Sequence, residues 1–127
     1  MTNILLVGVG GFIGSALRYL VGGYVQQFSK SVNFPYGTLA VNLVGCFLIG
    51  FLAQLAESRS AFTDEARLFV FVGILGGFTT FSAFGNETVN LMRQGFGFNA
   101  FANISANVTL GLLVVWLGRA IGYLIWR

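Results

Sequence analysis

The sequence predicts an all-α membrane protein with four transmembrane helices. Of its 127 residues, 56% are hydrophobic and only 9% are charged, whereas a water-soluble domain carries about 25% charged residues. A helix needs roughly 20 apolar residues to cross the hydrocarbon core of a bilayer. A chain of this length therefore accommodates four such helices with short loops, and we expect a single integral membrane domain over residues 1–127.

The first two helices are predicted from long apolar runs. The first run covers about residues 4–24, and it is too long, and lacks the basic start, to be a cleaved signal peptide. A polar bridge from Gln26 to Asn33 follows it. Pro35 then stands where the next helix should begin, because proline lacks the N–H that the first helical turn leaves unpaired. The second helix is predicted at about residues 37–56.

The last two helices follow the only charge-dense loop, residues 57–65. Within this loop Thr63 or Asp64 is a candidate N-cap, since an oxygen-bearing side chain can accept a hydrogen bond from the first turn. We expect the third helix at about residues 65–92 and the fourth at about residues 99–124. With four crossings, both termini would lie on the same side of the membrane.

The composition excludes several functional classes. The chain has no histidine, one cysteine and four acidic residues, which cannot assemble a tetrahedral zinc site or a histidine-based catalytic triad. We therefore expect no enzyme. Cys46 has no partner for an intramolecular disulfide and is interpreted as a small buried residue. The formal charge of +3 is too small and too dispersed for a nucleic-acid partner.

The basic residues give almost no topology signal. An excess of Lys and Arg on one side normally orients a membrane protein, but here four basic residues fall on the side of the termini and three on the other. We therefore predict dual topology, in which oppositely inserted copies pair as an antiparallel homodimer, since a closed two-fold pair is the commonest assembly. The alternative is a single orientation decided by one charge. The two groups are Arg59, Arg67, Arg119 and Arg127 against Arg18, Lys30 and Arg93.

The sequence contains 18 glycines, more than its loops can use. Two small residues four apart on a membrane helix allow a neighbouring helix to approach closely. This spacing predicts interhelical contacts at three pairs of positions. They are Gly10 with Gly14, Gly73 with Gly77, and Gly118 with Gly122.

Polar side chains within apolar helices are costly in a membrane, so they indicate either function or hydrogen bonds between helices. In the second helix, Thr38 and Asn42 are four residues apart and share a face. In the fourth helix, Asn99, Asn103 and Asn107 repeat at the same spacing and form an amide stripe. This spacing is compatible both with interhelical hydrogen bonding and with a hydrated ion track, and both interpretations stay open.

The most distinctive segment is Gly76–Phe84, with the sequence GGFTTFSAF. Its glycines and threonines are poor helix formers, so we predict a break in the third helix. Backbone carbonyls freed in such a break commonly coordinate a cation. Phe81 and Phe84 lie three residues apart on one face, with Glu87 on the same line. Their electropositive ring edges suit an anion, whereas the ordinary interpretation of such a pair is core packing.

Three segments together resemble the Fluc (CrcB) family of fluoride channels. They are GGFIGSALRY at residues 10–19, GTLAVNLVG at residues 37–45, and the segment 76–84, in the order and spacing of the family. The likeness covers essentially the whole chain. It implies a passive, fluoride-selective channel that exports fluoride and so relieves its toxicity. It also implies a dual-topology antiparallel dimer with two pores, in the plasma (inner) membrane of a prokaryote.

The resemblance implies roles for residues of the second and third helices. Phe81 and Phe84 would contact fluoride through their ring edges. Asn42 would line the pore with its amide, and Ser82 and Thr80 would be its hydroxyl neighbours. Fluoride is small and strongly hydrated, so such donors would have to replace its water shell.

Further roles concern the surroundings of the pore. Arg18 matches a family arginine near an aqueous vestibule, where its charge would attract anions. Glu87 matches a family acid close to the pathway. The family often has hydroxyl residues in the fourth helix after the position of Asn107, and here the asparagines, Asn103 and Asn107 among them, would substitute for them.

The resemblance also implies a structural sodium ion, Na⁺, at the centre of the dimer. The backbone carbonyls of Gly76 and Thr79 would hold this ion together with the same pair from the partner subunit. The ion would fix the dimer rather than drive transport.

Two other functions stay open. A small dual-topology, proton-coupled multidrug or cation exporter also has four short helices, but it depends on an acid in its first helix. This chain has none there, so Glu87 would have to serve. A non-transporting subunit that packs against a larger membrane complex through its glycine faces is the third interpretation.

Overall fold

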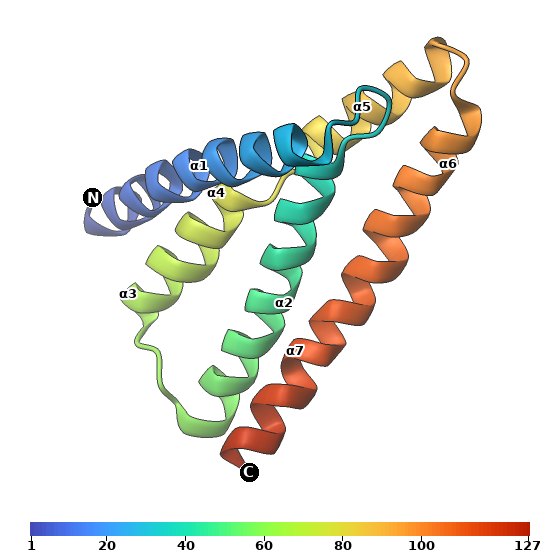
Figure 1. Ribbon diagram of the computed structural model, residues 1–127. Coiled ribbons are helices and arrows are strands. Elements are labelled where there is room, and N and C mark those ends of the chain that lie inside the picture. The colour runs from blue at the N-terminus through green and yellow to red at the C-terminus, as the bar shows by residue number, and fades with distance from the viewer.

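The computed structural model describes residues 1–127 and consists of helices joined by short loops (Figure 1). Four helical spans are long and apolar enough to cross a membrane. The predicted number and order of these spans are confirmed. Their bounds are Thr2–Ser29, Tyr36–Arg59, Asp64–Arg93 and Gly97–Trp126.

The first span, α1 (Thr2–Ser29), is longer than the predicted 4–24 and absorbs half of the expected polar bridge. The side chain of Gln26 explains why a polar segment stays helical. Its Nε2 donates to the carbonyl oxygens of Ser31 at 2.8 Å and Phe34 at 3.0 Å, and its Oε1 accepts from the backbone N–H of Gly37 at 3.0 Å. Gln26 thus lies in the helix and organises the turn that follows it.

The next two helix starts agree with the sequence. Pro35 is the N-cap of α2 (Tyr36–Arg59), where its missing N–H costs no hydrogen bond. Thr63 is the N-cap of α3 (Asp64–Arg67), and its hydroxyl oxygen accepts from the backbone N–H of Ala66 at 3.2 Å. Both predicted boundaries are confirmed.

The third span is built from several pieces. After α3 come η1 (Leu68–Leu75), a π-helix, and α4 (Gly76–Phe78), and the span ends with α5 (Ser82–Arg93). Residues 79–81 between α4 and α5 are not helical, and Thr79 is extended, with φ −91° and ψ 159°. Figure 1 shows this short extended segment passing close to α1 and α2.

The fourth span forms one long helix in Figure 1. It comprises α6 (Gly97–Ser105), the π-helical turn η2 (Ala106–Leu110) and α7 (Gly111–Trp126). Turns of π-helix are rare and are frequent at functional sites. The turn η2 carries Asn107, the last asparagine of the predicted stripe.

The predicted glycine contacts lie where two pairs of helices approach closely. α1 packs against η1 and α4, and α2 packs against α7. A Cβ atom on Gly14 would overlap the carbonyl oxygen of Ile74, and one on Gly118 would overlap the carbonyl oxygen of Phe47. Because the obstacle is backbone in both cases, only glycine allows these helices to approach so closely. The structural interpretation of the glycine pairs is confirmed.

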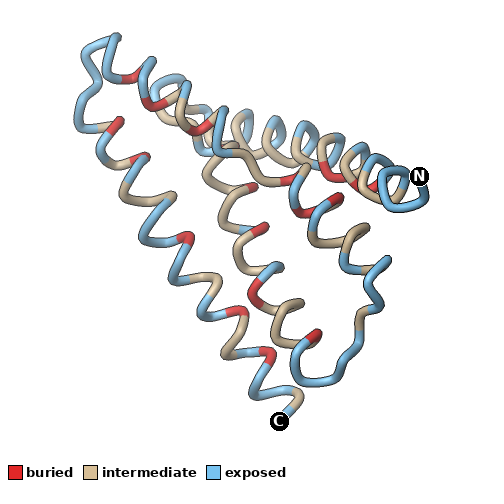
Figure 2. The backbone as a smooth tube through the Cα atoms, turned by 180° about the vertical axis from the view of Figure 1, so that it is seen from behind, coloured by how far each residue is buried: buried red, intermediate tan, exposed pale blue.

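The bundle is thin and its outer surface is apolar. Only 18 of 127 residues are buried, and Figure 2 shows them as isolated positions along the inward sides of the helices. Large hydrophobic side chains are exposed on every span, as at Phe12, Ile49, Val72 and Trp116. Such a surface is unfavourable in water and suits a chain that is surrounded by lipid.

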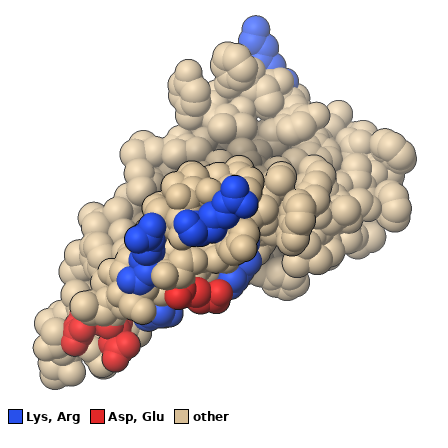
Figure 3. Space-filling model, turned by 90° about the horizontal axis from the view of Figure 1, so that it is seen from below, with Lys and Arg blue, Asp and Glu red and all other residues tan.

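The end of the molecule with the α2–α3 loop carries most of the charge. Viewed from this end in Figure 3, most of the basic and acidic side chains lie in the lower left of the view, with basic atoms also at the top edge, and most of the surface is uncharged. Here the guanidinium of Arg119 on α7 forms two 3.1 Å hydrogen bonds to the carboxylate of Glu57 on α2. Both side chains are largely exposed, and an exposed pair of this kind contributes little to stability.

Candidate functional site

The interruption between α4 and α5 is held by a side chain of another helix. The backbone N–H of Thr80 donates to Oδ1 of Asn42 at 2.9 Å, and Nδ2 of Asn42 donates to the carbonyl oxygen of Thr80 at 3.1 Å. The side-chain amide on α2 therefore bonds both the N–H and the C=O of Thr80, which belong to two successive peptide groups. A backbone that leaves a helix needs such partners at membrane depth, where water does not supply them.

This arrangement leaves two backbone carbonyls without their helical donors. The N–H of Thr80, which would bond Gly76 in a continuous helix, is used by Asn42. The N–H of Ala83, which would bond Thr79, donates instead to the hydroxyl of Thr80 at 3.1 Å. No backbone hydrogen bond to the oxygen of Thr79 replaces it. Gly76 and Thr79 both line a cavity, so their oxygens are of the kind that coordinates cations at interrupted helices.

That cavity, which we call the inner cavity, has a volume of about 380 Å³ and lies among α2, η1, the interruption and η2. Its wall includes Asn42, Thr80, Asn107 and both phenylalanines of the predicted pair. The rings of Phe81 and Phe84 are 5.6 Å apart between centroids, with planes inclined by 60°. Phe81 is 83% exposed, whereas Phe84 is 8% exposed. The two rings are neighbours but differ in exposure, because Phe81 precedes the first turn of α5 whereas Phe84 lies within that helix.

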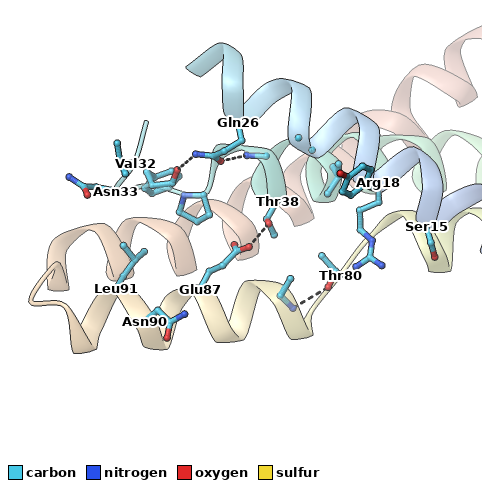
Figure 4. Close-up of a pocket in the computed structure, with 18 of the residues that line it drawn as sticks. Ser15, Arg18, Gln26, Val32, Asn33, Thr38, Thr80, Glu87, Asn90 and Leu91 are labelled. Carbon is cyan, nitrogen blue, oxygen red and sulfur yellow. Dashed lines mark hydrogen bonds between the residues drawn. The ribbon is translucent and has the colours of Figure 1, made fainter. Parts of the chain in front are cut away.

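A second cavity of about 590 Å³, the outer cavity, lies among α1, the α1–α2 loop, α2 and α5 (Figure 4). Arg18, Thr38, Thr80 and Glu87 line it. The hydroxyl of Thr38 donates to Oε1 of Glu87 at 2.7 Å. Oε2 of Glu87 is buried and has no hydrogen-bond partner. Arg18 forms no ion pair with this carboxylate, so its positive charge is available to an anion in the cavity.

Thr80 lines both cavities. In Figure 4 it lies beside Arg18 at the start of α5, with its hydroxyl engaged by the N–H of Ala83. The outer cavity is the polar one, and the inner cavity holds the phenylalanines. Thr80, in the interruption of the third span, is the one residue that the two linings share.

The amide stripe of the fourth span is hydrogen-bonded along most of its length. Nδ2 of Asn42 donates to Oδ1 of Asn107 at 2.9 Å. Nδ2 of Asn107 donates to the backbone carbonyl oxygen of Asn103 at 2.9 Å and to its side-chain Oδ1 at 3.0 Å. Asn103 in turn donates to the hydroxyl of Thr88 at 3.0 Å. Asn99 only bonds the carbonyl of Asn33 at 3.2 Å. The stripe thus links α2, α5 and the fourth span.

The structure brings most of the predicted site residues together, with two exceptions. Ser82 lines neither cavity, and its hydroxyl oxygen lies 3.5 Å from the hydroxyl oxygen of Thr80. Asn103 also lines neither cavity and is fully buried. Thr88 and Gln26 also take part in these hydrogen bonds and turns, although the sequence patterns did not single them out. Thr88 stands four residues after Phe84, whose carbonyl its hydroxyl bonds at 2.8 Å, and this spacing is the signal that would have found it.

Comparison with known proteins identifies the family. Residues 5–119 match the family described as CrcB-like protein, Camphor Resistance (CrcB). The chain belongs to the CrcB family. The matched range includes every candidate site residue from Arg18 to Asn107.

Individual CrcB relatives are similar over nearly their whole length. The Fluoride-specific ion channel FluC of Agrobacterium fabrum is 48% identical over 123 residues, which are 96% of this chain and 97% of that protein. The protein of the same name from Rhizobium meliloti is 46% identical, over 95% of this chain and 96% of its own length. The protein of this name from Methylobacillus flagellatus is 44% identical, over 93% of this chain and 92% of its own length.

Proposed function

We propose that the protein is a passive, fluoride-selective ion channel that exports fluoride across a membrane and so relieves fluoride toxicity. Membership of the CrcB family and the names of its relatives support this function. The observation that carries it is the interrupted third span. Thr80 there lies between a polar cavity that contains an unpaired Arg18 and a cavity that contains Phe81 and Phe84.

The two cavities suggest successive steps of conduction. Arg18 raises the local concentration of anions in the outer cavity, because opposite charges attract strongly where water is scarce. Fluoride then exchanges hydration water for donors near Thr80 and for the ring edges of Phe81 and Phe84. Both Nδ2 hydrogens of Asn42 are engaged, by Thr80 and Asn107. The amide of Asn42 therefore contacts the ion only when one of these bonds opens.

We propose that the functional unit is an antiparallel, dual-topology homodimer with two pores. Phe81, which lines the inner cavity, is a large apolar ring that is 83% exposed. A second copy would cover this ring and complete the pore wall. The nearly balanced distribution of basic residues supports insertion in both orientations. The membrane in question is the plasma (inner) membrane of a prokaryote, the kind of cell from which the compared relatives come.

We propose further that the carbonyls of Gly76 and Thr79 hold a structural Na⁺ at the centre of this dimer. The residues fit such an ion, because both carbonyls lack their helical donors and both line the inner cavity. Carbonyl oxygens are ligands that hard cations such as Na⁺ prefer. When bound, the ion would neutralise the carbonyl dipoles and tie the two interruptions together.

Anion efflux from liposomes tests the channel. Vesicles containing the pure protein are loaded with potassium fluoride or potassium chloride, valinomycin is added, and an ion-selective electrode records release. We expect rapid fluoride release, negligible chloride release, and no dependence on an imposed proton gradient. Release that follows the proton gradient would favour the exporter, in which Glu87 would be the essential acid. Silence for both anions from folded, dimeric protein would overturn the channel.

Matched variants test the proposed contacts in the same assay. Phe84→Leu removes a ring of the inner cavity, and we expect fluoride release to slow about tenfold, which corresponds to roughly 1.4 kcal/mol. Phe101→Leu is the control, because Phe101 is 68% exposed on α6 and lines neither cavity. Equal rates for the two variants would contradict the role of the phenylalanine pair.

A further inference from the structure

Asn103 is the most completely buried polar residue of the protein. Its relative exposure is 0%, and it lines neither the outer nor the inner cavity. An ion that travels through these cavities therefore does not reach it. A polar side chain at this depth is expensive unless every group is bonded, so the bonds that it makes indicate what it does.

The bonds of Asn103 fix the orientation of the next amide. Both of its oxygens accept from Nδ2 of Asn107, at 2.9 Å and 3.0 Å. Two acceptors on one side leave Asn107 a single orientation, with its NH₂ group toward Asn103 and its Oδ1 toward Asn42. If Asn107 turned over, its oxygen would face the oxygens of Asn103 and lose both hydrogen bonds.

The same orientation is passed on to the interruption. Oδ1 of Asn107 accepts from Nδ2 of Asn42 at 2.9 Å, so Asn42 also has only one favourable orientation. In that orientation, Oδ1 of Asn42 accepts a hydrogen bond from the N–H of Thr80, and the second hydrogen on Nδ2 of Asn42 is donated to the carbonyl oxygen of Thr80. A turned Asn107 would oppose two NH₂ groups, and Asn42 would have to release Thr80 to avoid this.

Thr88 closes the chain of bonds on the other side. Nδ2 of Asn103 donates to the hydroxyl of Thr88 at 3.0 Å, and this hydroxyl donates to the carbonyl of Phe84 at 2.8 Å. Thr88 is only 5% exposed. The chain therefore begins and ends on the same segment, at Thr80 and at Phe84, and crosses two other spans in between.

We infer that Asn103 and Thr88 are positioning residues for anion conduction, which act through Asn107 and Asn42 to hold the backbone N–H and C=O of Thr80 in place without touching the ion. This inference rests on the proposed channel function and gives the stripe a specific task. A change at Asn103 alters which atoms Asn42 presents to the inner cavity, although the two residues are joined only through Asn107.

The experiment combines fluoride efflux with a direct view of the Asn42 amide. Asn103→Leu and Thr88→Val remove the bonds while keeping the number of side-chain heavy atoms, and Thr88→Ser keeps the hydroxyl. Asn99→Leu is the matched control, since Asn99 lies on the same stripe and bonds only the carbonyl of Asn33. NMR of protein labelled with ¹⁵N-asparagine reports the side-chain NH₂ signals, and those of Asn42 are identified by their loss in Asn42→Asp.

We expect Asn103→Leu and Thr88→Val to shift the Asn42 NH₂ signals and to slow fluoride release by about fivefold or more, as for a coupling of ordinary size. Thr88→Ser should restore both readouts, and Asn99→Leu should change neither. If Asn103→Leu does not fold, Thr88→Val decides. Unchanged Asn42 signals, or shifted signals with unchanged release, would overturn the inference. Should the unaltered protein release no fluoride, the channel function fails, and the NMR signals alone still test the hydrogen-bonded chain.

Discussion

Substitution of a single glycine at the α1 interface should destabilise the protein measurably. A Cβ atom added to Gly14 would overlap the carbonyl oxygen of Ile74 and would lie 2.9 Å from the carbonyl carbon of Ile74 and 3.0 Å from the backbone nitrogen of Phe78. All three obstacles belong to backbone, so no side chain can move aside. α1 would have to shift away from η1 and α4. Ala at Gly11, by contrast, meets nothing within 4 Å.

The size of the effect follows from this geometry. Overpacking of a close contact costs about 1–3 kcal/mol, which corresponds to a roughly 5- to 150-fold change in the unfolding equilibrium constant. Gly11→Ala should cost nothing, because alanine is the better helix former. Both variants add one methyl group to the same helix, so the difference isolates the contact with the backbone of Ile74 and Phe78.

Reversible unfolding in mixed detergent micelles, followed by circular dichroism, measures both variants against the unaltered chain. We expect a lower midpoint for Gly14→Ala and an unchanged or slightly higher midpoint for Gly11→Ala. Since the backbone at Phe78 adjoins the interruption, Gly14→Ala should also slow fluoride release. Equal midpoints for the two variants would refute the argument that close backbone packing requires glycine at this position.

Two further predictions concern charged side chains. Glu87→Gln keeps an oxygen acceptor for the hydroxyl of Thr38 and removes a negative charge from the outer cavity, so liposomal fluoride release should be at least as fast as in the unaltered protein. A large loss of rate in folded protein would contradict this and show that the carboxylate itself is needed. Arg119→Gln removes an exposed pair with Glu57, and the free energy of unfolding should fall only slightly, with a smaller difference at high salt. A large loss that does not depend on salt would show that the pair is not the surface contact described above.

The sequence determined the number, order and approximate bounds of the spans. Hydrophobic length alone specifies a transmembrane helix, because lipid satisfies no backbone group and each span must bond internally. The helix starts at Pro35 and Thr63 were also predictable, because helix capping depends only on residues close by in the chain. The polar Gln26 was predicted to lie in the loop, because the backbone groups that its side chain bonds lie five to eleven residues further along the chain.

The site was predicted as residue types and not as an arrangement. Phe81, Phe84, Asn42 and Arg18 were identified from motifs and resemblance, yet only the tertiary structure separates an outer from an inner cavity with Thr80 between them. Spacing along one helix likewise left the amide stripe open between ion track and hydrogen bonding. The structure shows that successive hydrogen bonds from Asn103 through Asn107 and Asn42 connect the stripe to Thr80 in the interruption.

The physical reason for this division lies in the range of the interactions. Burial in lipid and helix capping depend on neighbours in the chain, so a sequence read from end to end contains them. The partner of Asn42 is 38 residues away at Thr80 and 65 residues away at Asn107. Such pairs exist only after glycines such as Gly118 have let α2 and the fourth span approach, and that approach is a property of the folded bundle.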